Sequence, residues 1–322
     1  MRISTQSFYD QSRSAMGAQQ SNMLRVQQQL GAGTKILAPS DDPLGATRAL
    51  AVSQSIALNA QYSASRAQAT HNLTIEDGAL QSATSVLQNI KTSVIEAGNG
   101  TMSDADRATI ATALQSSLDQ LQGLANTDDG NGQFLFAGFK SGSAPFVRQA
   151  DGSISYAGDQ GQRMLQVDVS RQMAGTDDGH GIFQTLQNGA GYIDAAGATR
   201  TGTDMFSAIS DVIAALRKPV DGAGPVAQAQ LQSALAIGNR NITNAHDNVL
   251  TVRASVGSRL QELAALGVTG DSRTLYDKSY LSELQDLDYA SAIAEFYQRQ
   301  TALQASQQTF VKIQHIALFN YL

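Results

Sequence analysis

The chain contains no cysteine and no tryptophan, and each absence excludes a class of structure or chemistry. Without cysteine it can form no disulfide, no thiol nucleophile and no thiolate metal site. Only 6% of its 322 residues are aromatic, whereas 42% are hydrophobic. Few aromatics together with much Ala, Gln, Ser and Leu favour long helices over a thick globular core.

Excess positive charge and long apolar runs are also missing. The net charge is −6, so composition gives no reason to expect nucleic acid or an anionic membrane as a partner. No window approaches the roughly 18 apolar residues of a membrane-spanning helix. The opening, MRISTQSFYDQS, lacks the apolar core of a signal peptide. We therefore expect a soluble protein that does not use the general secretory route.

The C-terminal segment 289–322 contains neither proline nor glycine and predicts one helix of about nine turns. An apolar residue recurs in it every seven positions. This column is Tyr289, Phe296, Leu303, Phe310 and Ala317. The column expected beside it is Ile293, Gln300, Gln307 and Gln314. Because a stable coiled coil needs two apolar columns, this half-amide seam is expected to pair weakly on its own.

The N-terminal 30 residues follow the same pattern. Their apolar column is Tyr9, Met16, Met23 and Leu30, and its flank contains Gln19, Gln20, Val26 and Gln27. Two half-seams at opposite ends of one chain suggest that the two terminal helices pack on each other. Periodicity alone also allows an independent amphipathic helix at each end.

A loop is predicted between the first and second helices. Gly31 and Gly33 are expected to end the first helix, since glycine tolerates the left-handed conformation that closes a C-terminus. The loop itself contains Pro39, Ser40 and Asp41. Asp42 is then the expected N-cap and Pro43 the first helical residue. A metal or acid/base role for the paired aspartates would need a third ligand or base nearby, and the spacing offers none.

Two long inner helices have stronger seams. Residues 43–97 carry the column Leu73, Leu80, Leu87 and Val94, and residues 226–266 carry Ile242, Val249, Val256 and Leu263. We expect these two helices to form the core of one antiparallel bundle, with a shorter helix capped by Ser103 folded back on the first. The segment 267–279, GVTGDSRTLYDKS, is expected to break the second long helix. A last helix then runs into the C-terminal segment.

The middle of the chain, residues 131–205, changes to glycine-rich and aspartate-rich turns between short apolar runs. The predicted strands are FLFAGF (134–139), PFV (145–147), SISY (153–156) and MLQVDV (164–169). Two stretches, DDGNG (128–132) and TDDGHGIF (176–183), resemble metal-binding loops only faintly, and we interpret both as turns.

These patterns predict a mainly α protein, a long antiparallel bundle or coiled coil formed by both chain ends, with a small β-rich domain inserted in the middle. The expected domains are 1–42 with 280–322, 43–130 with 206–279, and 131–205. The four histidines lie far apart, and no HExxH, GxSxG, P-loop or dinucleotide motif is present. We therefore expect no catalytic, cofactor or metal site.

The terminal segments resemble the bacterial flagellin family. Residues 27–50, QQQLGAGTKILAPSDDPLGATRAL, are similar to the family's segment between its first two helices. DYASAIAEF, QTALQAS and the closing LFNYL are similar to its C-terminal region. The opening MRISTQSFYDQS, the Ser40–Pro43 loop and GNGQFLFAGFKSGSAPF (130–146) are more similar to the family member that joins hook to filament than to flagellin itself.

The resemblance implies a structural protein of the extracellular flagellum. It implies type III export with a chaperone on the C-terminal helix, then a ring of copies between hook-associated protein 1 and flagellin. The assembly and chaperone interface would comprise Tyr9, Met16, Met23, Leu30, Tyr289, Phe296, Leu303, Phe310, Ile313, Leu318 and Leu322. The alternatives are flagellin itself and a secreted adhesin-like protein that carries the β-rich region on a helical stalk.

Overall fold

The computed structural model of the chain describes residues 2–184, 192–193, 199–200 and 204–319. It divides into two compact units. Unit 1 comprises residues 1–60 with 271–322, and unit 2 comprises 61–270. Both boundaries fall inside helices, so α2 (Pro43–Ala97) and α5 (Pro225–Gln285) contribute residues to both units. The predicted mainly α fold with a small β-rich insertion is confirmed.

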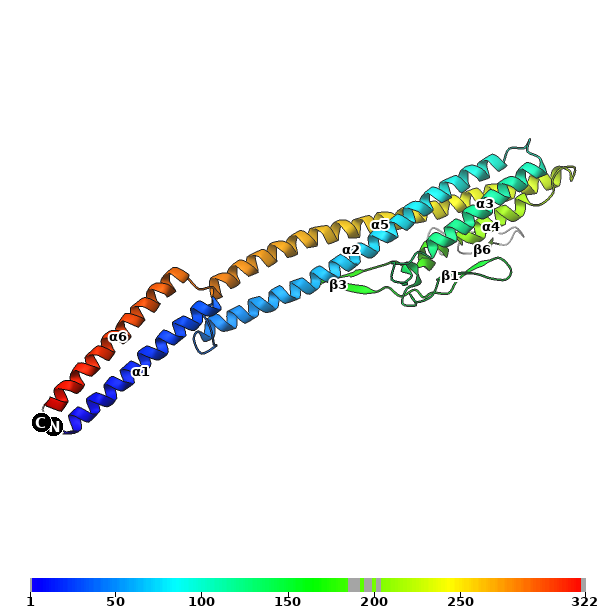
Figure 1. The fold of residues 1–322 in the computed structure, drawn as a ribbon. Helices are drawn as coiled ribbons and strands as arrows, with labels where there is room; N and C mark the ends of the chain where they lie inside the picture. Colours follow the sequence, from blue (N-terminus) through cyan, green and yellow to red (C-terminus); the bar gives the residue numbers. More distant parts are fainter. Residues whose placement is uncertain (1, 185–191, 194–198, 201–203, 320–322) are drawn as a thin grey trace. The chain divides into compact units, whose positions relative to one another are not determined.

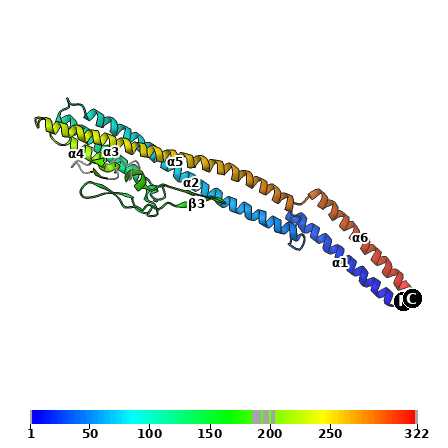
Figure 2. The ribbon, with the colours of Figure 1, turned by 180° about the vertical axis from the view of Figure 1, so that it is seen from behind.

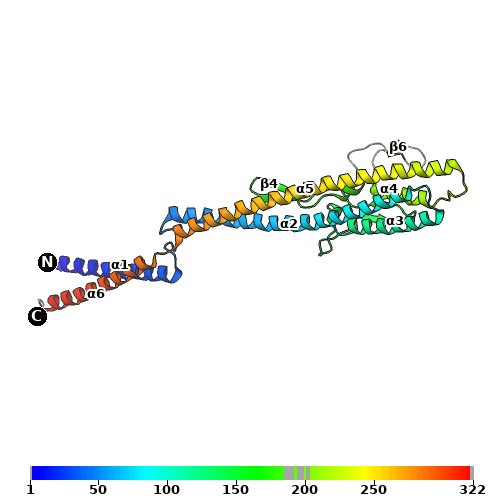
Figure 3. The same cartoon turned by 90° about the horizontal axis from the view of Figure 1, so that it is seen from above.

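Unit 1 pairs the two ends of the chain. Helix α1 (Arg2–Ala32) and helix α6 (Tyr289–Phe319) lie side by side in Figure 1, in Figure 2 and in Figure 3. The rings of Tyr9 and Phe310 meet edge to face, with centroids 6.0 Å apart. The terminal helices therefore pack on each other, and the alternative of two independent helices is wrong.

In unit 1, backbone hydrogen bonds join the loop that follows α1 to the loop that precedes α6. Gly33, at φ 71°, turns the chain after α1, while Gly31 is still helical. Lys35 N–H donates to Gln285 O at 2.9 Å, and Leu287 N–H donates to Gly33 O at 3.1 Å. The loop after α1 and the loop before α6 thus form one small antiparallel connection between residues 34 and 286.

The predicted break of the second long helix at 267–279 is wrong, because α5 continues through Gln285. A side chain at Gly267 would meet nothing within 4 Å, so this glycine leaves the helix unstrained. Hydrogen bonds to α2 hold the segment, from Asn59 Nδ2 to Thr274 Oγ1 at 2.5 Å and from Ser55 Oγ to Asp277 Oδ2 at 2.7 Å. The break comes later, before Asp288, whose carboxylate accepts from Ala290 N–H at 3.0 Å and so caps α6.

Unit 2 is built on the seam between α2 and α5. The predicted columns of both helices, from Leu73 to Val94 and from Ile242 to Leu263, are buried. Helix α3 (Asp104–Ala125) buries Leu114, Leu118 and Leu121 in the same core and lies beside α4 (Met205–Leu216), as Figure 3 shows. The antiparallel bundle is therefore confirmed.

The inserted region contains three antiparallel hairpins. They are β1 (Phe146–Arg148) with β2 (Ile154–Tyr156), β3 (Met164–Asp168) with β4 (Arg171–Ala174), and β5 (Tyr192–Ile193) with β6 (Thr199–Arg200). A short 3₁₀ turn η1 (Leu135–Ala137) precedes the first hairpin, and a π-helical turn η2 (His180–Gln184) lies between the second and the third. The strands expected at 145–147, 153–156 and 164–169 are confirmed within a residue or two, whereas β4 was missed.

The strand predicted at FLFAGF (134–139) is wrong. Leu135, Phe136 and Ala137 form the buried turn η1, and Gly138 follows at φ 67°. A side chain at Gly138 would lie 2.3 Å from the carbonyl oxygen of Asp159, so the chain is pressed against its neighbour there. Phe136 packs edge to face on Phe183, with ring centroids 5.4 Å apart. The segment thus buries Leu135, Phe136 and Ala137, leaves Phe139 61% exposed, and forms only the isolated bridge of Phe134 with Asp128.

Gly33 provides a test of the turn after α1. Replacing it with alanine forces a side chain into the left-handed region, and the new Cβ would lie 2.9 Å from Tyr289 Oη. We expect Gly33→Ala to weaken the α1–α6 pair by about 1 kcal/mol. Hydrogen-exchange measurements should then show amide exchange in α1 that is roughly fivefold faster.

The matched control is Gly31→Ala, two residues earlier in the helix, where a Cβ meets nothing within 4 Å. This substitution should slow exchange, since alanine favours helix by about 1 kcal/mol over glycine. Equal effects of the two substitutions would contradict the assigned turn.

Candidate assembly surface

The seam between α1 and α6 contains most of the apolar column expected in each helix. Tyr9, Met16, Met23 and Leu30 of α1 are partly buried, as are Phe296, Leu303 and Phe310 of α6. Val26 and Ala292 are buried at 5% exposure each. Apart from these two, the described seam side chains remain partly accessible to solvent, so the pair buries less apolar surface than the α2–α5 seam of unit 2.

The described glutamines of the expected second column, Gln300 and Gln307, do not lie in this seam, which corrects the expectation from periodicity. Gln300 and Gln307 are exposed, and Ile293 is 45% exposed. The second seam column is offset by three residues from the first rather than by four. It consists of Ala292, Arg299 and Ser306, which are buried or partly buried. Seven-residue repeats define a column, but they do not say on which side of it the partner helix lies.

An uncharged face of α6 is therefore left towards solvent. Its residues recur at alternating spacings of four and three and so lie on one side of the helix. We call this the outer stripe, and it consists of Ile293, Tyr297, Gln300, Gln304, Gln307 and Val311. Tyr297 is 62% exposed and Val311 is 50% exposed. All six side chains of this row, three apolar residues and three amides, are exposed.

The remaining proposed interface residues have different positions. Tyr289 is 51% exposed and lies beside the Gly33 turn. Ile313 and Leu318 belong to α6, but their side chains are outside what the structure describes, and Leu322 lies outside the described residues.

The Ser40–Pro43 loop is held by its aspartates. Asp42 Oδ1 accepts from Gly45 N–H at 2.9 Å at the start of α2, where Pro43 is the first residue. Asp41 Oδ2 accepts from Leu37 N–H and from Ala38 N–H, both at 3.1 Å. The hydrogen bond from Ala38 is the largest contribution that lowers the pKa of Asp41, and Arg25, 3.3 Å away, adds to it. Ser40 is exposed. Both carboxylates thus serve as acceptors for loop backbone.

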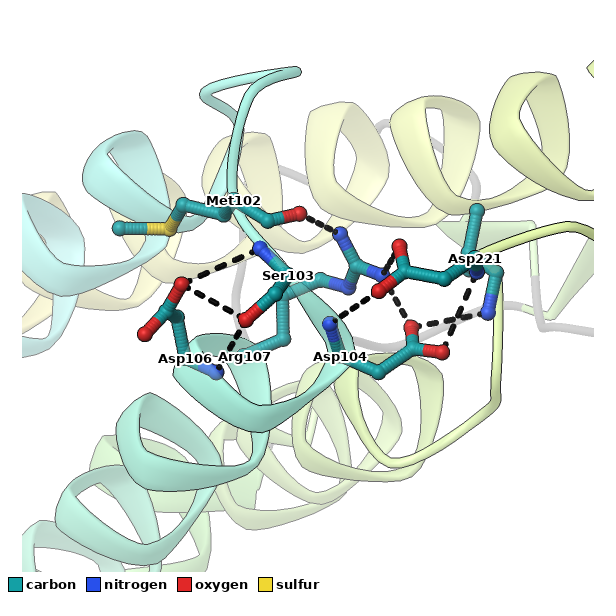
Figure 4. Close-up of polar contacts among 7 residues, drawn as sticks. Met102, Ser103, Asp104, Asp106, Arg107 and Asp221 are labelled. Atoms are coloured by element: carbon teal, nitrogen blue, oxygen red, sulfur yellow. Dashed lines mark hydrogen bonds and ion pairs between the residues drawn. The ribbon is translucent and has the colours of Figure 1, made fainter.

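A second polar cluster lies in unit 2 where α3 begins (Figure 4). Ser103 and Asp106 form a capping box, and the pKa of Asp106 is lowered chiefly by the Ser103 hydroxyl. The guanidinium of Arg107, a residue only 4% exposed, donates to Met102 O and contacts the carboxylates of Asp104 and Asp221.

Asp104 also ties α3 to the turn between α4 and α5. Its carboxylate accepts from Val220 N–H at 2.9 Å and from Asp221 N–H at 3.1 Å, while its own N–H donates to Asp221 Oδ2 at 2.8 Å. The Val220 hydrogen bond is the main cause of the lowered pKa of Asp104. The Ser103 cap follows from the local sequence, whereas the pairing of Asp104 with Asp221 has no local signal, because the two residues are 117 positions apart.

Among the described residues, no three His, Asp or Glu side chains come together in a way that could hold a metal ion. In the 128–132 stretch, Asp129 Oδ1 accepts from Asn131 N–H at 2.9 Å and from Gln133 N–H at 3.1 Å, as in a turn. No helix in the described ranges is long and apolar enough to cross a bilayer.

The buried Arg107 guanidinium predicts a measurable effect of losing this cation. Arg107→Met leaves two partly exposed carboxylates without their partner and should lower the free energy of unfolding of unit 2 by about 1–3 kcal/mol, measured by urea denaturation. Arg148→Met is the control, because Arg148 pairs with Asp119 at the surface, with side chains 38% and 55% exposed. That change should cost less than about 1 kcal/mol. Similar losses for both variants would argue against the cluster's role.

The comparisons with known proteins agree with this architecture. Residues 3–141 match the bacterial flagellin N-terminal helical region. The putative flagellar hook-associated protein from Vibrio parahaemolyticus has a similar fold, with TM-score 0.63, 24% identity and coverage of 76% of this chain and 100% of that one. The flagellar junction protein FlgL from Legionella pneumophila aligns with TM-score 0.59, 20% identity and coverage of 74% and 99%.

Sequence similarity extends over nearly the full length. A flagellin of Clostridium tyrobutyricum is 26% identical over 199 residues, which cover 60% of this chain and 50% of that protein. Flagellar hook-associated protein 3 of Escherichia coli K12 is 37% identical over 319 residues, and that of Salmonella typhimurium LT2 is 38% identical over 319, in each case 99% of both chains. This chain therefore belongs to the flagellar hook-associated protein 3 family and is a component of the bacterial flagellum.

Proposed function

We propose that this chain joins the flagellar hook to the filament, in a ring of its own copies between hook-associated protein 1 and flagellin. The observation that carries the proposal is similarity to hook-associated protein 3 over 99% of both chains. The flagellin match covers only half of that protein, so a filament subunit is the weaker candidate. The proposed role is structural and needs no catalytic residue.

The surface of unit 1 supports a role in assembly. Large apolar side chains remain exposed on α1, α2, α5 and α6 of this unit, namely Leu24, Leu44, Leu50, Leu58, Leu275, Tyr276, Tyr297 and Val311. Exposed apolar groups that gather on one part of a protein commonly mark contacts with other proteins. We infer that neighbouring subunits complete the burial that the α1–α6 pair leaves unfinished.

The proposal also assigns roles along the chain. Residues 1–42 with 280–322 would form the inner tube, 43–130 with 206–279 the surrounding bundle, and 131–205 the inserted β-rich domain. Export would follow the flagellar type III route, with a chaperone on α6. An α6 whose seam is only partly buried is easy to separate from α1, which such a route requires.

Deletion of residues 289–322 in the producing bacterium tests the junction role. Unit 2 should stay folded, because its core receives no side chain from α6. We expect cells without filaments, with flagellin shed into the medium, measured by electron microscopy and by immunoblotting of the supernatant. Normal filaments in this strain would exclude the junction function.

Charges on the outer stripe provide a finer test. Tyr297→Lys combined with Val311→Lys should preserve the helical content of the purified chain, because both side chains are exposed, yet abolish filament attachment. The matched control is Gln298→Lys with Thr301→Lys, two exposed positions on α6 outside the stripe. Equal loss of motility in the two strains would mean that the stripe has no special part in assembly.

Purified protein separates the two candidate functions. A flagellin should elongate without limit from seeds, whereas a junction protein should add one layer to hook ends and then stop. Unlimited growth of this chain alone would favour the filament subunit.

A further inference from the structure

Glu76, in the middle of the unit 2 segment of α2, is a buried carboxyl group that the proposed junction role does not use. It is 0% exposed. Its Oε2 accepts from Asp177 N–H at 3.3 Å, whereas its Oε1 is buried without a hydrogen-bond partner. An ionised carboxylate in such a place is costly, because neither water nor a full set of donors stabilises its charge.

The groups around Glu76 come from three elements and carry more acid than base. Asp177 lies between β4 and η2, and its carboxylate pairs with the guanidinium of Arg259 on α5. Arg259 also has a buried Nε without a partner. The guanidinium of Arg259 is therefore the cation for two carboxyl groups, those of Asp177 and Glu76, and it forms its ion pair with Asp177.

The other charged groups nearby already have partners. On α2 the next residue, Asp77, pairs with Arg253 of α5 at 3.1 Å. On β4, Arg171 pairs with Glu262 of α5 at 2.6 Å. Asp178 Oδ1 accepts from Gly181 N–H at 2.8 Å and adds negative charge to the same segment. Because Arg171, Arg253 and Arg259 are each paired with another carboxylate, an ionised Glu76 would be the unpaired negative charge of this cluster.

Burial is the main cause that raises the pKa of Glu76 well above its ordinary value, and the neighbouring Asp177 carboxylate raises it further against the opposing effect of Arg259. The protonated carboxyl can share its proton with Asp177, whereas the ionised form places a second negative charge beside it.

We propose that Glu76 is a proton-dependent latch that holds the β3–β4 hairpin and the chain up to η2 against α2 and α5. With the proton present, the segment is seated by the Asp177 N–H bond, by Arg259 and by the bond from Arg66 Nη1 to Val167 O at 2.9 Å. When Glu76 ionises, repulsion from Asp177 and the need of the carboxylate for water loosen this segment, while the α2–α5 seam stays closed.

The direction of the pH dependence follows from linkage. The folded state holds the Glu76 proton more tightly than the unfolded chain, whose glutamate has the ordinary value of 4.5. The stabilisation is therefore complete below that pH and is lost as the pH rises through the raised pKa. Paired surface carboxylates such as Glu262, whose pKa is lowered chiefly by the Arg171 hydrogen bond, act in the opposite direction.

Hydrogen exchange of the full chain at about pH 5 and about pH 8, corrected for intrinsic exchange, tests the latch. In the wild type, amides of residues 164–184 should lose protection at the higher pH, whereas those of α3 should not. Glu76→Gln, which keeps the shape without the charge, should retain protection at both values. The matched control is Glu262→Gln, which also contacts the hairpin but is partly exposed, and it should keep the wild-type pH response. A pH response in Glu76→Gln equal to the wild type's would refute the proposal.

A second measurement needs no variant. The chain has five glutamates, so ¹³C labelling of their carboxyl carbons gives five resonances to titrate. One of them should stay in the neutral form well above the range of the other four. Five ordinary titrations near the free value would overturn the latch. Neither experiment involves the flagellum, so its outcome is independent of the junction role.

Discussion

The apolar seam between α2 and α5 is the interaction on which unit 2 depends. Leu73, Leu80 and Leu87 are 0% exposed, and each such side chain contributes about 1.5–3 kcal/mol through burial. The stabilisation from this burial allows the unit to tolerate buried polar groups and to include two-stranded hairpins, which are only marginally stable when isolated. The β3–β4 hairpin is attached to the bundle by Val167 and Met173, which are buried in the core, and by charged groups, among them Arg66 and the Arg171–Glu262 pair.

In unit 1, by contrast, polar side chains link the long helices and apolar side chains are exposed. Where α2 and α5 pass through it, they are linked by Ser55 with Asp277 and by the buried Asn59 with Thr274, while Leu275 is 73% exposed on the outside. On α6, the exposed Gln300, Gln304 and Gln307 do not line the seam with α1. They separate the apolar residues of the outer stripe. Because amide groups lie between its apolar residues, this face remains hydrated in the free chain. It can still be buried when a neighbouring subunit provides a complementary surface.

The sequence was sufficient for features that depend on local patterns. Helix limits near Pro43 and Ala97, the Ser103 cap and both seam columns of unit 2 follow from period and capping chemistry. Three features required tertiary information. Helix α5 continues past Gly267 to hydrogen-bond partners on α2 at Thr274 and Asp277, the turn η1 is buried against Phe183, and α1 lies on the Ala292 side of α6. A uniformly apolar run shows neither a helix period nor a strand period, and a single apolar column does not tell on which side of it the partner helix packs. The structure of FLFAGF and the side of α6 that faces α1 could therefore not be predicted from the sequence alone.

The same constraint explains why the two charge clusters of unit 2 differ. Each has one guanidinium between two carboxyl groups, so each carries one surplus negative charge. At Arg107 the carboxylates of Asp104 and Asp221 are 35% and 53% exposed, and water can stabilise the surplus. At Arg259 the second carboxyl belongs to Glu76, which no water reaches. Solvent screens the first cluster, whereas the second can lose its surplus charge only by binding a proton. The place where the hairpin meets the bundle should therefore loosen as the pH rises, in the direction derived for Glu76.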